Sequence, residues 1–389
     1  MERIPERILM VHNFYQYAGG EDEVYRAESA LLSGKGHKVF NFEADNKKIQ
    51  SINPLRLFSN TIWNPETVQE INKIIRQEKI ELIHCHNTFP LISPSIYYAA
   101  GENNIPVVQT IHNFRLICLN SYLYREGKIC EDCLGKFLPW PGVFHSCYRN
   151  NPAASFGVAA MLVSHRLLHT YTHKVNKYIA LSDFSKRKLI QSGLPEEKIA
   201  VKPNFITPDP GIRENQGNYA LFIGRLDPTK GINTLVNAWG NLSNIKLMIA
   251  GDGPLYDNLL ARTKTNSDIH MLGYAPKNEV IKLLKEARFL IFPSELFENC
   301  PMVILEAYAC GIPVLAPAHG SIQEMVIHHK TGVLYRPGDL VDLSNKIQWC
   351  WQNIERMEEF GKNARKVFEE KYNQDSNYRS LLSIYASVM

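Results

Sequence analysis

The sequence predicts an α/β protein built from two doubly wound domains, each with a parallel sheet. Its 389 residues are more than one ordinary hydrophobic core accommodates. Short apolar runs alternate with amphipathic helical segments, and the alternation restarts after a stretch rich in Pro and Gly at 208–217. We therefore expect an N-terminal domain over 1–207 and a C-terminal domain over 208–371. A last helix, about 372–389, is expected to pack back on the first domain.

Composition and charge narrow the class of protein. Hydrophobic residues make up 45% and charged residues 21%, which is typical of globular proteins. A net charge of +4 gives no case for nucleic acid, although it does not oppose an anionic substrate or membrane. The first residues lack the layout of a signal peptide, and no apolar run approaches the roughly 18 residues of a membrane span. We expect a cytoplasmic protein whose eight cysteines are thiols or metal ligands.

A glycine pair opens the first helix. The strand Arg7–His12 is followed by a polar turn with Gly19 and Gly20, then by a helix that ends near Gly34. In a doubly wound domain, ligands bind at the carboxyl ends of the strands, so backbone at this turn can approach a ligand closely. Glycine pairs also mark ordinary turns, and this alternative stays open.

Two further strands of the first half end in His-Asn. The strand Leu82–Cys85 leads to His86, and the strand Pro106–Ile111 leads to His112. The carboxyl ends of parallel strands lie at the same edge of a sheet, so both imidazoles are expected there. In a doubly wound domain this edge is where ligands bind. We take His112 as a candidate functional residue, against the alternative of an ordinary hydrogen-bonded histidine.

Four cysteines fall in an irregular stretch after His112. They are Cys118, the pair Cys130 and Cys133 in a CxxC spacing, and Cys147. The set suits a structural zinc site, but a second CxxC is missing, and buried thiols or a redox pair are alternatives. No catalytic role is expected of it.

The next segment, Ala153–Lys177, is predicted to be one helix that is first apolar and then basic. Such a helix can rest on an anionic bilayer. We favour the alternative, a core helix with a solvated basic side.

The second half begins with a loop that carries two cations. Gly224–Gly231 lies between a strand and a well-marked helix, and contains Arg225 and Lys230. A guanidinium and an ammonium at a helix entrance suit a diphosphate. The order of a Walker loop is absent, and Gly251-Asp252-Gly253 lacks the third glycine of a dinucleotide fingerprint.

The stretch Pro293–Pro317 carries two carboxylates. We expect a loop with Glu298, a helix capped by Asn299 with Pro301 in its first turn, and Glu306 about two turns inside. The helix should end at Gly311. Carboxylates near a helix N-terminus suit the hydroxyls of a sugar attached to a diphosphate. Farther on, 340–370 is predicted as one long helical tract and 376–387 as the final helix.

These motifs resemble glycosyltransferase family 4, the retaining nucleotide-sugar enzymes with the GT-B fold, in which two Rossmann-like domains flank a cleft. The C-terminal matches are Phe222–Leu226 with Lys230-Gly231, Ala250–Pro254, and the Glu-x7-Glu element Glu298…Glu306 followed by Gly311–Val314. The N-terminal matches are Gly19-Gly20, Thr110–Asn113, Leu181-Ser182 and Lys202–Asn204. The resemblance covers nearly the whole chain.

The resemblance implies a role for each matching residue. Arg225 and Lys230 neutralise the donor diphosphate, Glu298 holds hydroxyls of the donor sugar, and Glu306 holds the ribose. His112 lies against the sugar, and Gly19-Gly20 faces the donor phosphate and the acceptor. Further donor contacts are implied at Asn299, Cys300, Pro301, Met302 and Val303. Many members have Glu-Gly-Phe-Gly where this chain has Glu298-Asn299-Cys300-Pro301. This departure puts the sugar preference in doubt, but it does not affect the expected reaction class.

The function expected is that of a retaining hexosyltransferase that uses a UDP- or GDP-sugar. Its acceptor is a glycan or glycolipid of polysaccharide or cell-envelope biosynthesis, with peripheral contact with an anionic membrane as an additional expectation. No catalytic metal is expected, since the chain lacks the Asp-x-Asp donor clamp of the other common transferase fold. An epimerase or hydrolase of the same fold and a noncatalytic nucleotide-sugar-binding protein are the alternatives.

Overall fold

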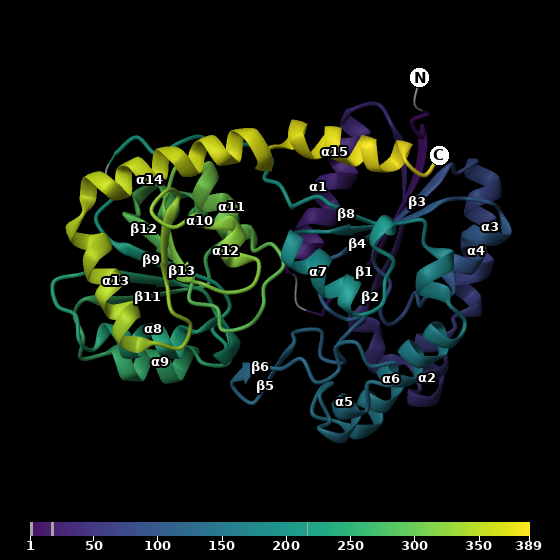
Figure 1. Cartoon of the computed structure of the whole chain (residues 1–389), viewed down its shortest axis with the longest axis horizontal. Helices are drawn as coiled ribbons and strands as arrows, with labels where there is room; N and C mark the ends of the chain where they lie inside the picture. The colour runs from purple at the N-terminus through teal and green to yellow at the C-terminus, as the bar shows by residue number, and fades with distance from the viewer. Residues whose placement is uncertain (1–2, 17–18, 216) are drawn as a thin grey trace. The chain divides into compact units, whose positions relative to one another are not determined.

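The chain folds into two compact units (Figure 1). The computed structural model describes residues 3–16, 19–215 and 217–389. The N-terminal unit comprises Met1–Leu123, Cys130–Asn204 and Asn377–Met389, and the C-terminal unit comprises Tyr124–Ile129 and Phe205–Ser376. Each unit has a six-stranded parallel sheet, so the predicted pair of doubly wound domains is confirmed.

The sheet of the N-terminal unit has the order β2-β1-β3-β4-β7-β8. Its strands are β1 (Arg7–Phe14), β2 (Lys38–Asp45), β3 (Leu82–Asn87), β4 (Val107–Ile111), β7 (Lys177–Ala180) and β8 (Ile199–Val201). The register pairs Ile8 with Leu82 and Ile83 with Val107, so these strands end at the same edge. The connecting helices include α1 (Gly20–Gly34), α3 (Pro65–Glu78), α4 (Ile96–Glu102) and α7 (Asp183–Gln191). The Asn64 side chain caps α3.

The last helix, α15 (Gln374–Ala386), completes the core of the N-terminal unit. Leu381 and Tyr385 are buried in one cluster with Ile8 and Leu82. The Tyr385 hydroxyl also lies 2.7 Å from Nδ1 of the buried His84. Helix α15, near the C-terminus, thus packs against the sheet of the N-terminal unit.

The segment between β4 and β7 is largely irregular. It contains the hairpin β5 (Tyr124–Arg125) and β6 (Lys128–Ile129), then α5 (Trp140–Phe144), α6 (Pro152–Leu167) and a π-helical turn, η2 (Thr170–Lys174). The helix predicted over 153–177 therefore ends at Leu167. The reason is local, because His169 adopts a left-handed conformation (φ +53°) that a continuous helix excludes.

The sheet of the C-terminal unit has the order β11-β10-β9-β12-β13-β14. Its strands are β9 (Ala220–Ile223), β10 (Leu247–Ala250), β11 (Ile269–Gly273), β12 (Phe289–Ile291), β13 (Val314–Pro317) and β14 (Gly332–Tyr335). The helices include α8 (Ile232–Trp239), α9 (Tyr256–Thr263), α10 (Lys277–Glu286), α11 (Met302–Ala309) and α12 (Ile322–Met325). Trp239 and Phe289 are fully buried in its core.

Two helix predictions in this unit were wrong. The tract 340–370 is interrupted at Asn353, which separates α13 (Leu340–Gln352) from α14 (Ile354–Val367). Asn299 does not cap α11, since Pro301 occupies the capping position and no side chain supplies a cap. Glu306 accordingly lies in the second turn of α11, not beyond it. No helix in the described ranges is both long and apolar enough to cross a bilayer.

Candidate active site

In the C-terminal unit, a tight turn places Lys230 against the loop that follows β12. The Asp227 carboxylate accepts from the Thr229 backbone N–H (2.9 Å) and closes the turn η4 (Pro228–Lys230). Gly231 follows with φ +69°, and a Cβ there would lie 1.9 Å from the Pro293 carbonyl oxygen. Only glycine allows this approach without movement of backbone. The turn geometry therefore determines where the Lys230 ammonium lies.

Lys230 pairs with the first carboxylate of the Glu-x7-Glu element. Its Nζ lies 2.6 Å from Glu298 Oε1, and the Ser294 hydroxyl donates to the same oxygen at 2.8 Å. The Ser321 hydroxyl donates to the Glu298 backbone carbonyl, which anchors the loop. Side-chain exposure is 29% for Lys230 and 15% for Glu298. A cation and a carboxylate held this way at a partly open surface are suited to bind a phosphate and a hydroxyl.

Glu306 is more deeply buried and has a different partner. Its side chain is 7% exposed, and Oε1 pairs with Nζ of Lys277, at the start of α10. Sequence reasoning did not find Lys277, because an ordinary lysine at a helix start carries no motif. The pair positions Glu306 one turn after Met302.

Arg225 lies in the loop after β9, where its side chain is 56% exposed and its Nε is 3.7 Å from Asp227 Oδ2. The loop rests on Gly251, whose φ is +151° and where a Cβ would lie 1.9 Å from the Gly224 carbonyl oxygen. The Gly224 N–H donates to the Ala250 carbonyl at 3.1 Å. The glycines after β10 thus serve the packing of the Arg225 loop.

The residues before α11 surround its N-terminus. Asn299 and Cys300 are buried, and Pro301, Met302 and Val303 are half-buried. The first turn of α11 follows the Glu298 loop directly in the chain, and the free backbone N–H groups of a helix N-terminus suit an anion.

In the N-terminal unit, the two strand-end histidines are in contact. His112 follows β4, and its Nε2 lies 2.9 Å from Nδ1 of His86, which is inside β3. Burial is the main cause that lowers the pKa of His112 well below its usual range, so the ring is neutral near pH 7. Residues at these strand ends, among them Asn87, Phe89 and Arg115, line a pocket with His112.

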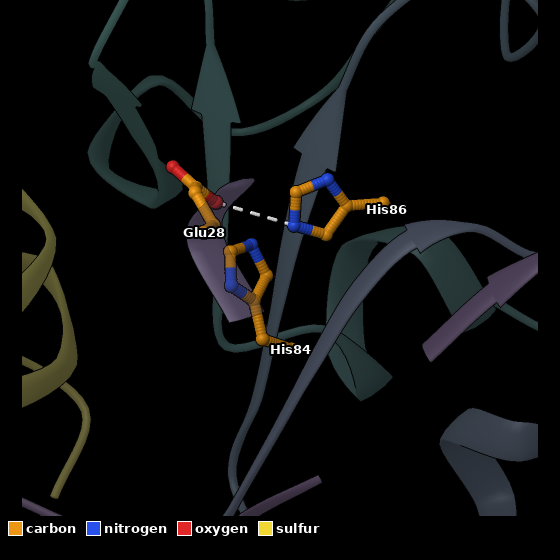
Figure 2. Close-up of side chains that lie close together, drawn as sticks. All are labelled: Glu28, His84 and His86. Atoms are coloured by element: carbon orange, nitrogen blue, oxygen red, sulfur yellow. Dashed lines mark ion pairs between the residues drawn. The ribbon is translucent and has the colours of Figure 1, made fainter. Parts of the chain in front are cut away.

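A buried carboxylate continues this chain of contacts (Figure 2). Glu28 Oε2 lies 3.2 Å from His86 Nε2, and neither atom has another hydrogen-bond partner in the described part of the chain. Burial alone would raise the pKa of Glu28, but Lys202 and His86 hold it well below its usual value. A charged carboxylate favours a proton on His86 Nε2, so His86 Nδ1 accepts and His112 Nε2 donates. The network thereby selects one tautomer of His112.

Glu28, His84 and His86 also meet the distance expected of metal ligands, since one atom from each lies within 4.8 Å of the others. The surrounding contacts argue against a metal there. Lys202 Nζ pairs with Glu28 Oε1, and both His84 nitrogens contact hydroxyls, Tyr385 at 2.7 Å and Thr110 at 2.8 Å. The Lys202 ammonium already supplies the positive charge that a metal ion would bring to Glu28.

The glycine pair begins α1. Gly19 precedes the helix and its N–H donates to Asp22 Oδ2 (3.1 Å), while Asp22 Oδ1 lies 2.7 Å from His12 Nε2. Gly19 has φ −138°, and no described atom lies within 4 Å of a Cβ built there. Gly20 is the first helical residue, and both glycines are exposed. Neither backbone strain nor packing against the described residues requires glycine at position 19.

Glu21 is a second group that sequence reasoning missed. It follows the glycine pair, and Oε2 accepts from Asn113 Nδ2 (3.2 Å) and the Tyr15 hydroxyl (3.3 Å). Burial raises the pKa of Glu21 to about 8. Asn113 is next to His112. The contact between Glu21 and Asn113 could not be predicted from the sequence, because these two residues are 92 positions apart.

The four cysteines of the predicted zinc site all lie in the N-terminal unit as thiols. Cys118 and Cys133 are buried, and Cys130 and Cys147 are half-buried. Burial raises the pKa of the Cys133 thiol to about 11, and the three other thiols also raise it.

Known proteins resemble the chain over its full length. Residues 207–367 match the model of the glycosyl transferases group 1, and residues 26–210 match that of Glycosyltransferase Family 4. A glycosyltransferase of Methanocaldococcus jannaschii, MJ1178, whose function is uncharacterized, is 25% identical over 97% of both chains. The amylovoran biosynthesis glycosyltransferase AmsK of Erwinia amylovora is 28% identical over 53% of this chain and 55% of its own.

A solved structure shows the same fold. Anabaena Alr3699/HepE, in complex with UDP-glucose, superposes with a TM-score of 0.66 over 97% of this chain and 99% of its own, at 17% identity. The two family models adjoin and together span residues 26–367. The chain therefore belongs to glycosyltransferase family 4 and has the GT-B fold.

Proposed function

We propose that this glycosyltransferase is a retaining hexosyltransferase that takes its sugar from a UDP- or GDP-sugar, in the cytoplasm. The acceptor is a glycan or lipid-linked sugar of polysaccharide or cell-envelope biosynthesis. The observation that supports the proposal is the contact of Lys230 Nζ with Glu298 Oε1, because an ammonium suits a phosphate and a carboxylate suits the hydroxyls of a sugar. UDP is favoured because the HepE structure of the same fold holds UDP-glucose.

Transfer requires the leaving diphosphate and a cationic sugar carbon to be stabilised together. In the proposed mechanism Arg225, Lys230 and the N-terminus of α11 stabilise the diphosphate as preorganised electrostatics, without a metal. Glu298 holds sugar hydroxyls, Glu306 holds the ribose, and His112 contacts the sugar. Retaining hydrolases use two close carboxylates. Because the motif offers one at the sugar, we propose front-face attack in which the departing phosphate takes the acceptor proton.

A panel of nucleotide sugars tests the donor. The true donor should raise the melting temperature and release its nucleotide when an acceptor is added. Glu298→Ala should abolish transfer with the fold intact, and near wild-type transfer by this variant would contradict the role of Glu298. Donor consumption without acceptor would instead indicate the epimerase or hydrolase, and binding without turnover the noncatalytic protein.

We also propose that Cys118, Cys130, Cys133 and Cys147 hold a structural zinc ion. The support is the CxxC spacing of Cys130 and Cys133, with Cys118 and Cys147 at loop distances in the sequence, and the tight turn where the Leu134 N–H donates to the Glu131 carbonyl at 2.9 Å. The native mass should include one zinc, and the variant with Cys130→Ser and Cys133→Ser should lose it. A native mass without metal rejects the proposal in favour of buried thiols or a redox pair.

A further inference from the structure

Three helices of the N-terminal unit share an exposed apolar surface. α6 packs against both α5 and α2 (Pro54–Ile62) (Figure 1). The rings of Phe58 on α2 and Phe156 on α6 stack, with their centres 6.2 Å apart. Large apolar side chains on these helices and on the loop before α5 are mostly exposed. They include Leu55 (80%), Phe137 (51%), Trp140 (58%), Phe144 (77%), Phe156 (57%) and Leu167 (63%). We name these six residues the apolar surface.

The sequence predicted a solvated basic side for α6, but its Arg166 side chain makes hydrogen bonds within the protein. Arg166 does not face solvent freely, because its guanidinium donates to the Lys136, Phe137 and Leu116 carbonyls. It fixes the loop that presents Phe137. The outer side of α6 is therefore apolar rather than only basic.

The two chain segments that carry the apolar surface hold cations and no acidic residue. Neither 46–65 nor 133–182 contains an Asp or Glu. Exposed cations in these two segments include Arg56, Lys136, Arg149 and Lys174. Arg56 pairs with Glu66 just outside the first segment, and Lys136 Nζ lies 5.1 Å from the Trp140 ring centre. Aromatic and aliphatic groups rimmed by cations are what an anionic membrane interface binds.

We propose that the apolar surface docks on a bilayer with anionic headgroups. Trp140 and the phenylalanines insert at the headgroup level, while Lys136 and Arg149 meet phosphates. A second copy of the chain is a poorer occupant, because two such surfaces would bring like charges together. Docking fits a lipid-linked acceptor, and this part rests on the proposed function.

Vesicle co-sedimentation of the full chain tests the docking. Wild type should bind vesicles of phosphatidylcholine with phosphatidylglycerol, bind pure phosphatidylcholine more weakly, and lose affinity in high salt. The double variant Trp140→Ser, Phe144→Ser should bind at least about tenfold more weakly. Tyr274→Ser is the matched control, because Tyr274 lies in the C-terminal unit and is as exposed (77%) as Phe144.

Donor binding, followed by thermal shift, should be the same in wild type and both variants, so failure of docking is separable from failure of the proposed donor site. Absence of binding to anionic vesicles, or equal binding by the double variant, would overturn the proposal. So would a dimer in sedimentation velocity that the double variant converts to monomer.

Discussion

Gly19 is a residue whose identity the folded chain itself does not explain. With φ −138° and no atom of the described residues within 4 Å of a Cβ built there, alanine fits among these residues without strain. We predict that Gly19→Ala changes the unfolding free energy by less than about 0.5 kcal/mol. Transfer should nevertheless fall by about tenfold or more, because a methyl group would occupy space that a ligand needs. Urea unfolding and initial rates measure the two quantities, and an unchanged rate would leave Gly19 as an ordinary turn residue.

The contacts Glu28–His86–His112 lead to a second prediction. In His86→Gln, the amide can still donate to Glu28 and accept from His112, whereas leucine can do neither. We expect His86→Leu to lower kcat by about tenfold, which is about 1.4 kcal/mol in the barrier. His86→Gln should stay close to wild type.

The tautomer itself is the direct readout. Nitrogen NMR, with the His112 signals assigned by difference from His112→Asn, should show the Nε2–H form in wild type and in His86→Gln. His84→Gln is the control, because His84 is equally buried but contacts Tyr385 and Thr110 instead. An Nδ1–H form of His112 in wild type would refute the network.

Glu21 should make stability depend on pH. Its pKa is raised from 4.5 to about 8 in the folded chain, so the folded state holds a proton that the unfolded state has lost. The contribution of Glu21 is therefore greatest below pH 4.5 and declines as pH rises to 8. At about 1.4 kcal/mol per pKa unit, the decline is at most about 5 kcal/mol.

The variant Glu21→Gln removes this group from the titration. Its stability relative to wild type should rise between pH 5 and pH 8.5, as followed by urea unfolding of the N-terminal unit. Glu23→Gln, an exposed change in the same helical turn, should show no such rise. A parallel pH profile for wild type and Glu21→Gln would contradict the raised pKa.

At the scale of elements, the turn before α8 is the most sharply constrained. Gly231→Ala would place a methyl group 1.9 Å from the Pro293 carbonyl oxygen at φ +69°, so the turn must shift and carry Lys230 away from Glu298. We predict a loss of about 2 kcal/mol or more in stability and weaker donor binding. Gly240→Ala, at the other end of α8 with φ −59°, should cost far less. Thermal unfolding measures the stability of both variants, and titration with the donor measures their affinity. Equal losses in Gly231→Ala and Gly240→Ala would contradict the prediction.

Sequence periodicity was a good guide to elements whose signals are local. The helix that ends at Gly34 and the strand before His112 rest on neighbouring residues and were found. The end of α6 was missed, because a left-handed residue such as His169 has no distinctive sequence signal. The beginning of α11 was placed too early, because the side chain of Asn299 looked like a cap but is buried in the loop.

The residues of the candidate site also fall into two groups, those that local spacing predicts and those that only the folded structure brings together. Glu298, Glu306 and Lys230 lie in recognisable spacings, so the sequence predicted them. Their partners are set by tertiary contact instead: Lys277 reaches Glu306 across 29 positions, and Glu28 reaches Lys202 across 174. Such pairs leave no pattern in one sequence, because any lysine can serve where the fold brings it close to a carboxylate.

At the scale of the whole molecule, the N-terminal unit depends on the last residues of the chain. Leu381, Ile384 and Tyr385 are buried in its core beside strands β1 and β3. A chain that stops at Ser376 loses these three side chains, and each deletion of this kind typically costs about 2–5 kcal/mol. We predict that the N-terminal unit of the truncated chain is largely unfolded, while the C-terminal unit keeps its own core around Trp239.

Hydrogen exchange resolved by peptide measures this directly. Peptides of β1, β3 and β4 should exchange rapidly in the truncated chain, and peptides of β9, β12 and β13 should stay protected. A milder variant, Tyr385→Phe, removes only the hydroxyl that contacts His84, so we expect about 1 kcal/mol of destabilisation confined to the N-terminal unit. Equal loss of protection in both units would contradict the prediction, because it would mean that the two cores unfold together. Unchanged exchange in β1 and β3 would mean that the packing of α15 contributes little to the sheet it covers.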